Sequence, residues 1–396
     1  MSRSSVFLAV PWRGDRRRVR RGCAVFVALG LTGPLHPTVA GAGPVAGAQL
    51  PEQARVLAVD HAIPHVSTVP ANAGEAVQLQ LRERVRPGVE GRANAHPDAA
   101  VLFVPGSATP SVPAYDLSFE DYSWMAYLAR AGLDVFALDP TGYGNSPRPK
   151  MDDPCNVNPP QQVVLVPNPL PGPCALDYPF RLGTTSSEQD ELDAAVDYIR
   201  ALRGVDRVSL VGWSLGGHRA GIYAAQHPEK VDRLVLLAPN YVRTSPSNPP
   251  ARLPQPGFPM ALRTRAEQVN WPGVGCAGQV DDAVKDPLWA TVNAYDPLGA
   301  TWGPPGGVMR IPVTSQWGWN ATTAGQVVAP TLIIRGALDT TISATNLTDL
   351  HDDLGTTDKA LITVPCASHF VVWESQRHVV HALSGAWLTG GALPHV

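Results

Sequence analysis

The chain has 396 residues, of which 44% are hydrophobic and 16% are charged, and its formal net charge is −3. This length is enough for one large domain with an insertion or for two domains, and the apolar fraction predicts a sizeable core. No basic stripe runs along the sequence, which argues against a nucleic-acid partner. The 40 prolines are interspersed with apolar residues and therefore predict long ordered loops.

The first 48 residues have the three parts of a secretory signal peptide. A basic segment at 16–21 precedes an apolar run at 23–31, and small residues at 46–48 form a cleavage-type site. Because the apolar run is too short to span a membrane, we expect a secreted or periplasmic protein with no membrane span in the mature chain. Removal of residues 1–48 takes away seven arginines and one aspartate, a net charge of +6, and changes the formal charge from −3 to about −9.

The cysteines predict a disulfide framework. Four remain once Cys23 leaves with the signal peptide, and an even count in an exported chain predicts two disulfides with three possible pairings. A bond between Cys155 and Cys174 would close one proline-rich loop, which favours that pair and leaves Cys276 with Cys366. The spacings do not resemble a zinc site, and no metal is expected.

Residues 49–240 alternate between apolar runs and segments with helical spacing, as the first part of a core domain. Continuous apolar runs are typical of strands buried on both faces of a parallel sheet. The expected strands are 76–86, 99–104, 135–138, 208–211 and 234–238, and the expected helices are 121–131, 185–202 and 218–226. Among them lies an ordered, proline-rich excursion at 147–183.

The alternation breaks at 241–326, a segment that holds five of the ten tryptophans and that we interpret as a cap inserted over one end of the sheet. It resumes at 327–396 with strands at 331–335 and 360–364 and a terminal helix near 373–389. Strands that alternate with helices predict an α/β fold with a mostly parallel central sheet and helices on both faces.

A serine between glycines stands where the strand 208–211 meets the following helix, in the sequence Gly-Trp-Ser-Leu-Gly at 212–216. This pattern is typical of a nucleophile elbow, in which a sharp turn exposes the Ser214 hydroxyl above a helix N-terminus. Such a serine needs a base and a group that orients the base. Asp339 and His369 each follow a late strand, so the three residues occupy equivalent strand ends, where open parallel sheets place their sites.

With these residues and the turn-rich loop 139–146, the segment 75–390 resembles an α/β-hydrolase of the serine esterase and lipase branch, with a cap insertion. The resemblance implies that Ser214 is the nucleophile, His369 the general base and acid, and Asp339 the orienting carboxylate.

The resemblance also implies an oxyanion hole made of two backbone donors. One is the N–H of Leu215, directly after the nucleophile. The other comes from the loop after the strand 99–104, where many relatives carry His-Gly before the donor residue. Here Pro105 replaces that histidine, and we expect the N–H of Ser107 to be the donor, with Gly106 as second choice.

A serine at the elbow excludes relatives such as haloalkane dehalogenases and epoxide hydrolases, which carry aspartate there. We therefore expect hydrolysis of a carboxylic ester, in a small molecule or a polymer, through an acyl-enzyme and without a cofactor. The cap is expected to select the substrate with an apolar, aromatic pocket. The candidate pocket residues are Trp213, Trp271, Trp289, Trp317 and Trp319.

Three alternatives stay open. A peptidase of the proline iminopeptidase type would use the same three residues and would need an acidic group in the cap for the substrate amine, for which Asp281, Asp282 and Asp286 are candidates. A hydrolase that cleaves a carbon–carbon bond in β-diketones would also use them. A non-catalytic binding protein on the same scaffold is the least favoured alternative, because the serine, aspartate and histidine are all present. The oligomeric state is not predicted.

Other polar residues receive ordinary roles. His218, one turn after the elbow serine, is interpreted as a packing residue of its helix, His381 as a surface residue, and Asp139 as a brace for the loop that it begins.

Overall fold

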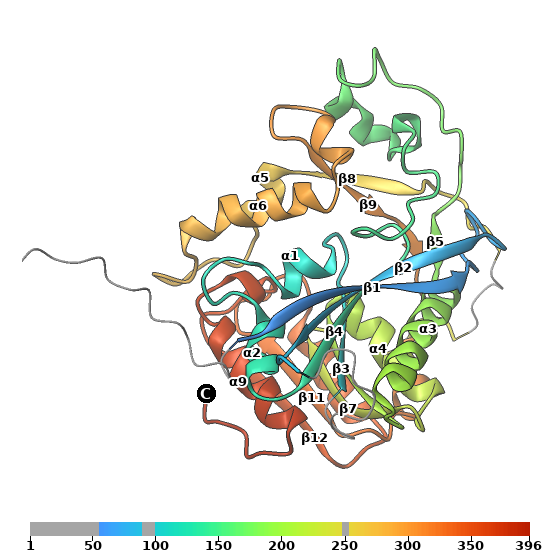
Figure 1. Ribbon diagram of the computed structural model, residues 1–396. Helices are drawn as coiled ribbons and strands as arrows, with labels where there is room; N and C mark the ends of the chain where they lie inside the picture. The colour runs from blue at the N-terminus through green and yellow to red at the C-terminus, as the bar shows by residue number, and fades with distance from the viewer. Residues whose placement is uncertain (1–54, 89–99, 248–252) are drawn as a thin grey trace, which may run out of the picture. The chain divides into compact units, whose positions relative to one another are not determined.

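The computed structural model describes residues 55–88, 100–247 and 253–396. The predicted signal peptide at 1–48 lies outside these residues. A sheet of eight strands forms the centre, in the order β1 (Leu57–Val66), β2 (Ala76–Val85), β4 (Asp134–Asp139), β3 (Ala100–Val104), β6 (Val208–Trp213), β7 (Val231–Leu237), β11 (Thr331–Gly336) and β12 (Lys359–Val364) (Figure 1). Strands β1, β2 and β4 pair antiparallel, and every later pairing is parallel.

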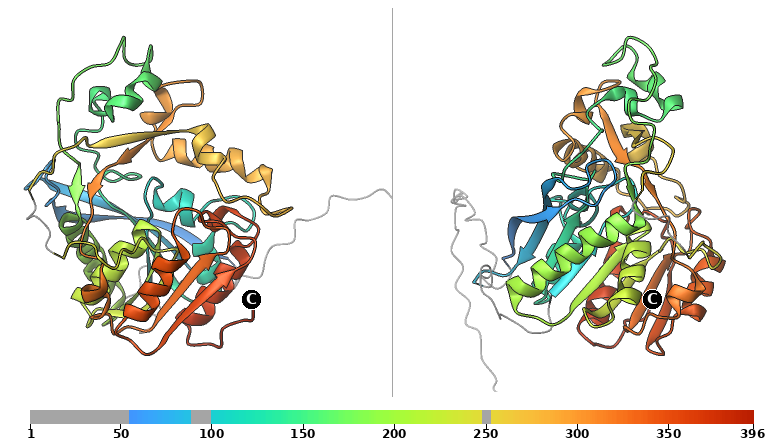
Figure 2. Two further views of the ribbon diagram at one scale, coloured as in Figure 1. Left: turned by 180° about the vertical axis from the view of Figure 1, so that it is seen from behind. Right: turned by 90° about the vertical axis from the view of Figure 1, so that its right-hand side faces the viewer.

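Helices cover both faces of this sheet (Figure 2). One apolar cluster joins the sheet to α3 (Thr185–Arg203), α4 (Leu215–Gln226) and α8 (Ala344–Asp353), and the other joins it to α1 (Ser111–Tyr115), α2 (Trp124–Arg130) and α9 (Arg377–Leu388), which a short turn η6 (Val371–Trp373) precedes. Side chains alternate between the two faces of the sheet along β3, so Leu102 belongs to the first cluster and Phe103 to the second. The predicted α/β architecture is confirmed.

Local sequence explains where the long helix α3 begins and ends. The Thr184 side chain accepts from the N–H of Ser187, whose side chain accepts from the N–H of Thr184, so the two form a capping box. The helix ends at Gly204, which has a φ of 64° and so takes the left-handed conformation that glycine tolerates.

The proline-rich excursion and most of the insertion form one additional layer, which we call the cap and define as residues 147–183 and 253–315. Its elements are η2 (Pro154–Asn156), η3 (Pro159–Leu165), β5 (Gly183–Thr184), β8 (Met260–Thr264), α5 (Arg265–Val269), η4 (Asp282–Val284), α6 (Lys285–Ala294), η5 (Gly299–Thr301), β9 (Val308–Pro312) and β10 (Thr314–Ser315). Its own apolar cluster takes residues from both segments, including Val157, Leu165, Met260, Leu262 and Trp302. We call the remaining described residues the sheet unit.

The cap lies beyond the strand ends of the sheet unit (Figures 1 and 2). A side chain at Gly142, in the loop after β4, would be 2.5 Å from Pro312, and one at Gly273 would be 2.7 Å from Ser368. The last helix of the predicted insertion, α7 (Ala321–Ala324), contacts α4 and α8 and therefore belongs to the sheet unit.

Candidate active site

The backbone of the elbow is strained at Ser214, which has a φ of 55° and a ψ of −116° between β6 and α4. Its flanking glycines are required sterically. A Cβ at Gly212 would lie 2.4 Å from the Gly216 carbonyl oxygen, and one at Gly216 would lie 2.0 Å from the Val104 carbonyl oxygen. A non-glycine residue in such a conformation costs on the order of 1–3 kcal/mol and is typical of functional sites.

His369 and Asp339 form a hydrogen-bonded pair at the ends of β12 and β11. The Nδ1 of His369 lies 2.9 Å from Oδ2 of Asp339, and both side chains are buried. The other oxygen of Asp339 accepts from the N–H groups of Thr341 (2.7 Å) and Ile342 (2.9 Å), which fixes the carboxylate. A carboxylate at Nδ1 favours the tautomer with hydrogen on Nδ1, so Nε2 is left as the acceptor.

Trp213 connects the elbow to the histidine loop. Its indole N–H donates to the carbonyl oxygen of His369 (2.8 Å), and the two rings lie 5.7 Å apart between centroids. The residue before Ser214 therefore holds the backbone of the residue that would act as base. The structure brings the predicted histidine loop to the elbow, with the predicted aspartate behind it.

The loop after β3 lies against the elbow. A Cβ at Gly106 would be 3.5 Å from Cβ of Ser214 and 3.1 Å from the Trp213 carbonyl oxygen. Among the described residues, the N–H groups of Gly106, Ser107 and Leu215 donate no hydrogen bond. Gly106 and Leu215 are buried, and because buried N–H groups nearly always have a partner, two unpaired ones at this place are unusual. Ser107 is exposed. These amides are therefore free to bind an oxygen of a ligand.

A buried cation that the sequence interpretation missed supports this loop. Arg219, on α4, donates to the Pro105 carbonyl oxygen and to the Glu188 carboxylate, each at 2.6 Å. Burial alone lowers the pKa of Arg219, but the Glu188 carboxylate and the Tyr143 phenol together more than offset burial and the pKa is raised. The Pro105 carbonyl shares its peptide group with the N–H of Gly106, so this bond orients and polarises that donor. A charged residue on an apolar helix one turn after the elbow is the signal that could have identified it.

Glu374 is a second residue that the sequence interpretation missed. Its carboxylate is fully buried and accepts from the Ser368 N–H (2.9 Å), the Ser368 hydroxyl, the Trp271 indole (2.9 Å) and the Gln279 amide (3.1 Å). It therefore connects the residue before His369 to the cap. No short motif marks it, because Trp271 and Gln279 lie 103 and 95 positions away in the sequence.

Two disulfides are present, and they are the pairs that the sequence favoured. Cys155–Cys174 lies within the cap, whereas Cys276–Cys366 joins the cap to the loop that carries His369.

The five candidate tryptophans are all buried. Trp271 and Trp289 donate their indole N–H groups to Glu374 and to the Gly306 carbonyl oxygen, in the apolar cluster that runs from the sheet into the cap. Trp319 has no exposed surface and fills the space over Gly221 and Tyr241. Trp317 lines a separate pocket of about 240 Å³ beside α3.

Three other residues can now be placed. His218 is buried, as a packing residue should be, and burial lowers its pKa to about 4. Asp139 accepts from the Ser111 N–H (2.7 Å), and burial raises its pKa to about 6. The expectation for His381 was wrong: it is buried and stacks on Trp124, because this turn of α9 faces α2, and burial lowers its pKa to about 3.

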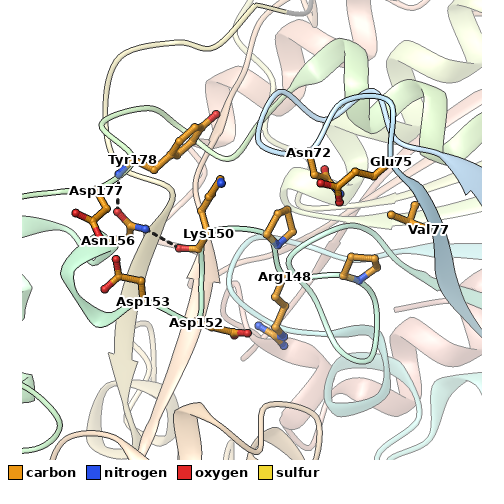
Figure 3. A pocket seen from close by; sticks show the side chains of 12 residues that line it. Asn72, Glu75, Val77, Arg148, Lys150, Asp152, Asp153, Asn156, Asp177 and Tyr178 are labelled. Atoms are coloured by element: carbon orange, nitrogen blue, oxygen red, sulfur yellow. Dashed lines mark hydrogen bonds between the residues drawn. The ribbon is translucent and has the colours of Figure 1, made fainter.

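A polar pocket of about 520 Å³ lies between β2 and the excursion (Figure 3). The Lys150 ammonium stands 5.9 Å from the Tyr178 ring centroid, and Asn156 bonds to the backbone of both residues. None of the predicted catalytic residues lines this pocket. Within the described ranges, no group of three or more His, Cys, Asp or Glu side chains is placed to hold a metal ion, and no helix there is long and apolar enough to cross a membrane.

Comparison with known proteins gives a family match and distant relatives. A family model described as the alpha/beta hydrolase fold matches residues 99–271. The chain is 40% identical over 57 residues to the poly(3-hydroxyalkanoate) polymerase subunit PhaC of Allochromatium vinosum, covering 14% of this chain and 16% of that protein. It is 36% identical over 81 residues to the monoacylglycerol lipase ABHD6 of Mus musculus, covering 19% and 24%. These matches thus span about a sixth to a quarter of the curated relatives.

Among solved structures, a serine hydrolase involved in carbazole degradation, the CarC enzyme, is similar over 84% of this chain and 99% of its own, with 17% identity and a TM-score of 0.49.

Proposed function

We propose that this chain, which has the α/β-hydrolase fold, is a serine hydrolase that cleaves carboxylic esters. One observation carries the proposal: a strained serine stands at an elbow that contacts both the loop of a His–Asp pair and a loop with free backbone N–H groups, all at the ends of parallel strands. This arrangement provides a nucleophile, a base with its orienting carboxylate, and donors for a developing oxyanion.

In the first half of the reaction, Ser214 attacks the ester carbonyl while Nε2 of His369 takes the hydroxyl proton. The carbonyl oxygen becomes an oxyanion that accepts from the N–H groups of Leu215 and of Gly106 or Ser107. When the carbon–oxygen bond breaks, His369 returns the proton to the leaving alcohol and an acyl-serine remains. Asp339 stays ionised and stabilises the imidazolium.

In the second half, His369 takes a proton from a water molecule, which attacks the acyl-serine. The second tetrahedral intermediate collapses, the proton returns to Ser214, and the carboxylic acid leaves. Each oxyanion-hole donor in such reactions is worth roughly 10²–10³-fold in kcat. The bond from Arg219 to the Pro105 carbonyl strengthens one of these donors, which supports this assignment.

An ester is favoured over a peptide with a free amine. The acidic residues considered for amine binding, Asp281, Asp282 and Asp286, are exposed. Asp282 pairs with Lys285 and Asp286 pairs with Arg265 at the surface, while Asp281 caps η4. A substrate amine next to the nucleophile would need a carboxylate inside the site.

We also propose that the protein works outside the cytoplasm. The signal-type segment at 1–48 motivates this proposal, and two disulfides fit an oxidising compartment. Expression with residues 1–48 intact, followed by N-terminal sequencing of exported protein, tests it; protein retained in the cytoplasm at full length would contradict it.

The catalytic proposal is tested with Ser214→Ala and an active-site probe. Wild type should hydrolyse 4-nitrophenyl esters and react with an organophosphonate at Ser214. Ser214→Ala should lose both, with kcat lower by roughly 10⁴- to 10⁶-fold. Ser186→Ala, a change at the first turn of α3, is the matched control and should keep both. Wild type that neither turns over esters nor reacts with the probe would refute the proposal, and turnover of a prolyl-anilide or a β-diketone alone would move it to those substrates.

A further inference from the structure

Arg263 extends from the cap strand β8 toward the sheet unit. Strands β8 and β9 form a two-stranded ribbon, in which Arg263 is opposite Met309. On one face, Met260 and Leu262 belong to the apolar cluster of the cap, whereas Met309 belongs to the cluster that continues into the sheet unit. Because side chains alternate along a strand, Arg263 shares the second face with Met309.

No carboxylate of the described residues lies within ion-pair distance of Arg263. Its one hydrogen bond to another side chain runs from the guanidinium to Oε1 of Gln268 (3.1 Å). Each buried arginine of the described segments does have a carboxylate partner, as Arg203, Arg219, Arg310 and Arg377 show. Arg263 is half-buried and has no such partner, so part of its charge is shielded from water without an ion pair, which is costly.

Nearby groups do not neutralise Arg263. Burial lowers its pKa, and Glu267 and Tyr143 offset burial only in part. The Glu267 carboxylate is exposed and caps α5 by accepting from Thr264. Burial raises the pKa of the Tyr143 phenol, so at neutral pH that group is uncharged.

A second donor with no partner stands beside the guanidinium. The Gln268 side chain is 1% exposed, its oxygen is occupied by Arg263, and its amide nitrogen makes no hydrogen bond within the described residues. A buried amide N–H without an acceptor costs about 1–3 kcal/mol. Arg263 and Gln268 therefore present a cation and a neutral donor that together match an anionic, planar acceptor.

Tyr143 places this pair near the candidate active site. Tyr143 follows Gly142, whose Cβ would lie 2.5 Å from Pro312 of β9, the strand partner of β8, and its ring lies 5.6 Å from the guanidinium of Arg219. Arg219 in turn donates to the Pro105 carbonyl oxygen, at the start of the candidate oxyanion loop. A ligand group held by Arg263 would thus stand on the oxyanion-loop side of the cap.

We propose that Arg263 and Gln268 bind a free carboxylate of the substrate, so that the preferred substrates are monoesters of dicarboxylic acids. This inference rests on the proposed ester hydrolysis and names its substrate class. A guanidinium fork binds a carboxylate with two parallel hydrogen bonds, which fixes the orientation of the substrate as well as its charge.

The test compares two esters of equal length in wild type and variants. The anionic ester is the mono-4-nitrophenyl ester of glutaric acid, and the neutral ester is 4-nitrophenyl valerate. Wild type should show a higher kcat/KM for the anionic ester. Arg263→Gln should lower the anionic-to-neutral ratio on the order of 100-fold, and Arg263→Lys should restore part of it. Arg265→Ala removes an exposed cap arginine and should leave the ratio unchanged.

A binding experiment separates this inference from the proposed catalysis. Calorimetry with Ser214→Ala should detect glutarate binding that Arg263→Gln abolishes, whether or not any ester is hydrolysed. The inference would be overturned, while ester turnover stands, if Arg263→Gln left the anionic-to-neutral ratio of kcat/KM unchanged. It would also be overturned if glutarate bound equally to Ser214→Ala with and without Arg263→Gln. Stronger binding of inorganic phosphate than of glutarate would also overturn it, in favour of a phosphorylated substrate.

Discussion

The sheet unit buries long apolar runs, whereas the cap relies on polar and covalent cross-links. Strands such as β3 and β6 are buried along their whole length and contribute to two large apolar clusters. The cap has one small cluster of its own, and its inner side continues one of the large clusters of the sheet unit. It is held in addition by a buried ion-pair network, by a disulfide within it and by a disulfide to the sheet unit. We therefore expect a single substitution in the cap to lower the stability of the cap without lowering that of the sheet unit equally.

Arg310 is one of the residues that join the two segments of the cap, as Gln161 and Leu262 also do. It is 4% exposed and binds Asp296 through its Nε (2.9 Å) and a terminal nitrogen (2.6 Å). Its other terminal nitrogen donates to the Met151 carbonyl oxygen (2.8 Å) and to Asp152 (2.7 Å), in the proline-rich excursion. This one guanidinium thus binds groups of both the excursion and the insertion.

The largest expected effect on stability comes from Arg310→Met. It leaves the buried Asp296 without its main partner and should destabilise the cap by about 3–5 kcal/mol. Urea unfolding followed by hydrogen exchange should show loss of protection in the cap before the sheet unit. The control is the exposed cap pair Arg265–Asp286, where Arg265→Ala should cost less than about 1 kcal/mol. Simultaneous loss of protection in both parts would show that they unfold as one cooperative unit.

The two disulfides offer a sharper comparison, because each should cost about 2–4 kcal/mol when removed but only one reaches the active site. Replacing Cys155 and Cys174 by serine should lower stability and leave kcat near that of wild type. Replacing Cys276 and Cys366 should also lower kcat roughly 10- to 100-fold, since Cys366 stands three residues before His369. Thermal unfolding and ester turnover measure the two effects. Equal kcat values in the two double variants would contradict this link between the cap and the site.

Much of the sheet unit could be predicted from the sequence because its signals are local. Apolar runs predicted β3, β4, β6, β7, β11 and β12, and the glycines around Ser214 predicted the elbow. Strand β1 was not predicted. It is an edge strand with few buried side chains, so it has no apolar run to detect.

The rest depends on contacts between distant segments, which no local pattern encodes. The cap combines residues more than 100 positions apart, as the pairing of Arg310 with Asp152 shows. Glu374 was missed for the same reason, since Trp271 and Gln279 lie on a distant segment. The roles of Ser214, Asp339 and His369 stay predictions until the variants are measured.

Glu191 lies at the border between the sheet unit and the cap, where the loop after β4 leads into the cap. Its carboxyl is buried on α3 and accepts from the Thr141 N–H (3.0 Å), and burial raises its pKa from the ordinary 4.5 to about 7. The folded protein therefore binds more protons than the unfolded chain between about pH 4.5 and 7. The stability that this proton supplies is fully present below pH 4.5 and is lost as the pH rises through 7.

Glu191→Gln removes this titratable carboxyl. The free energy of unfolding of the variant should therefore rise relative to that of wild type as the pH increases. At pH 8 the gain should be about 3 kcal/mol larger than at pH 4.5, from a shift of about 2.5 units at 1.36 kcal/mol each. Urea unfolding of both proteins at pH 4.5, 6 and 8 measures the difference, and Glu75→Gln controls for the loss of an exposed carboxyl. If the difference in free energy of unfolding between the two proteins stayed constant from pH 4.5 to 8, Glu191 would be ionised in the folded state. Water or the cap would then supply the carboxylate with a partner.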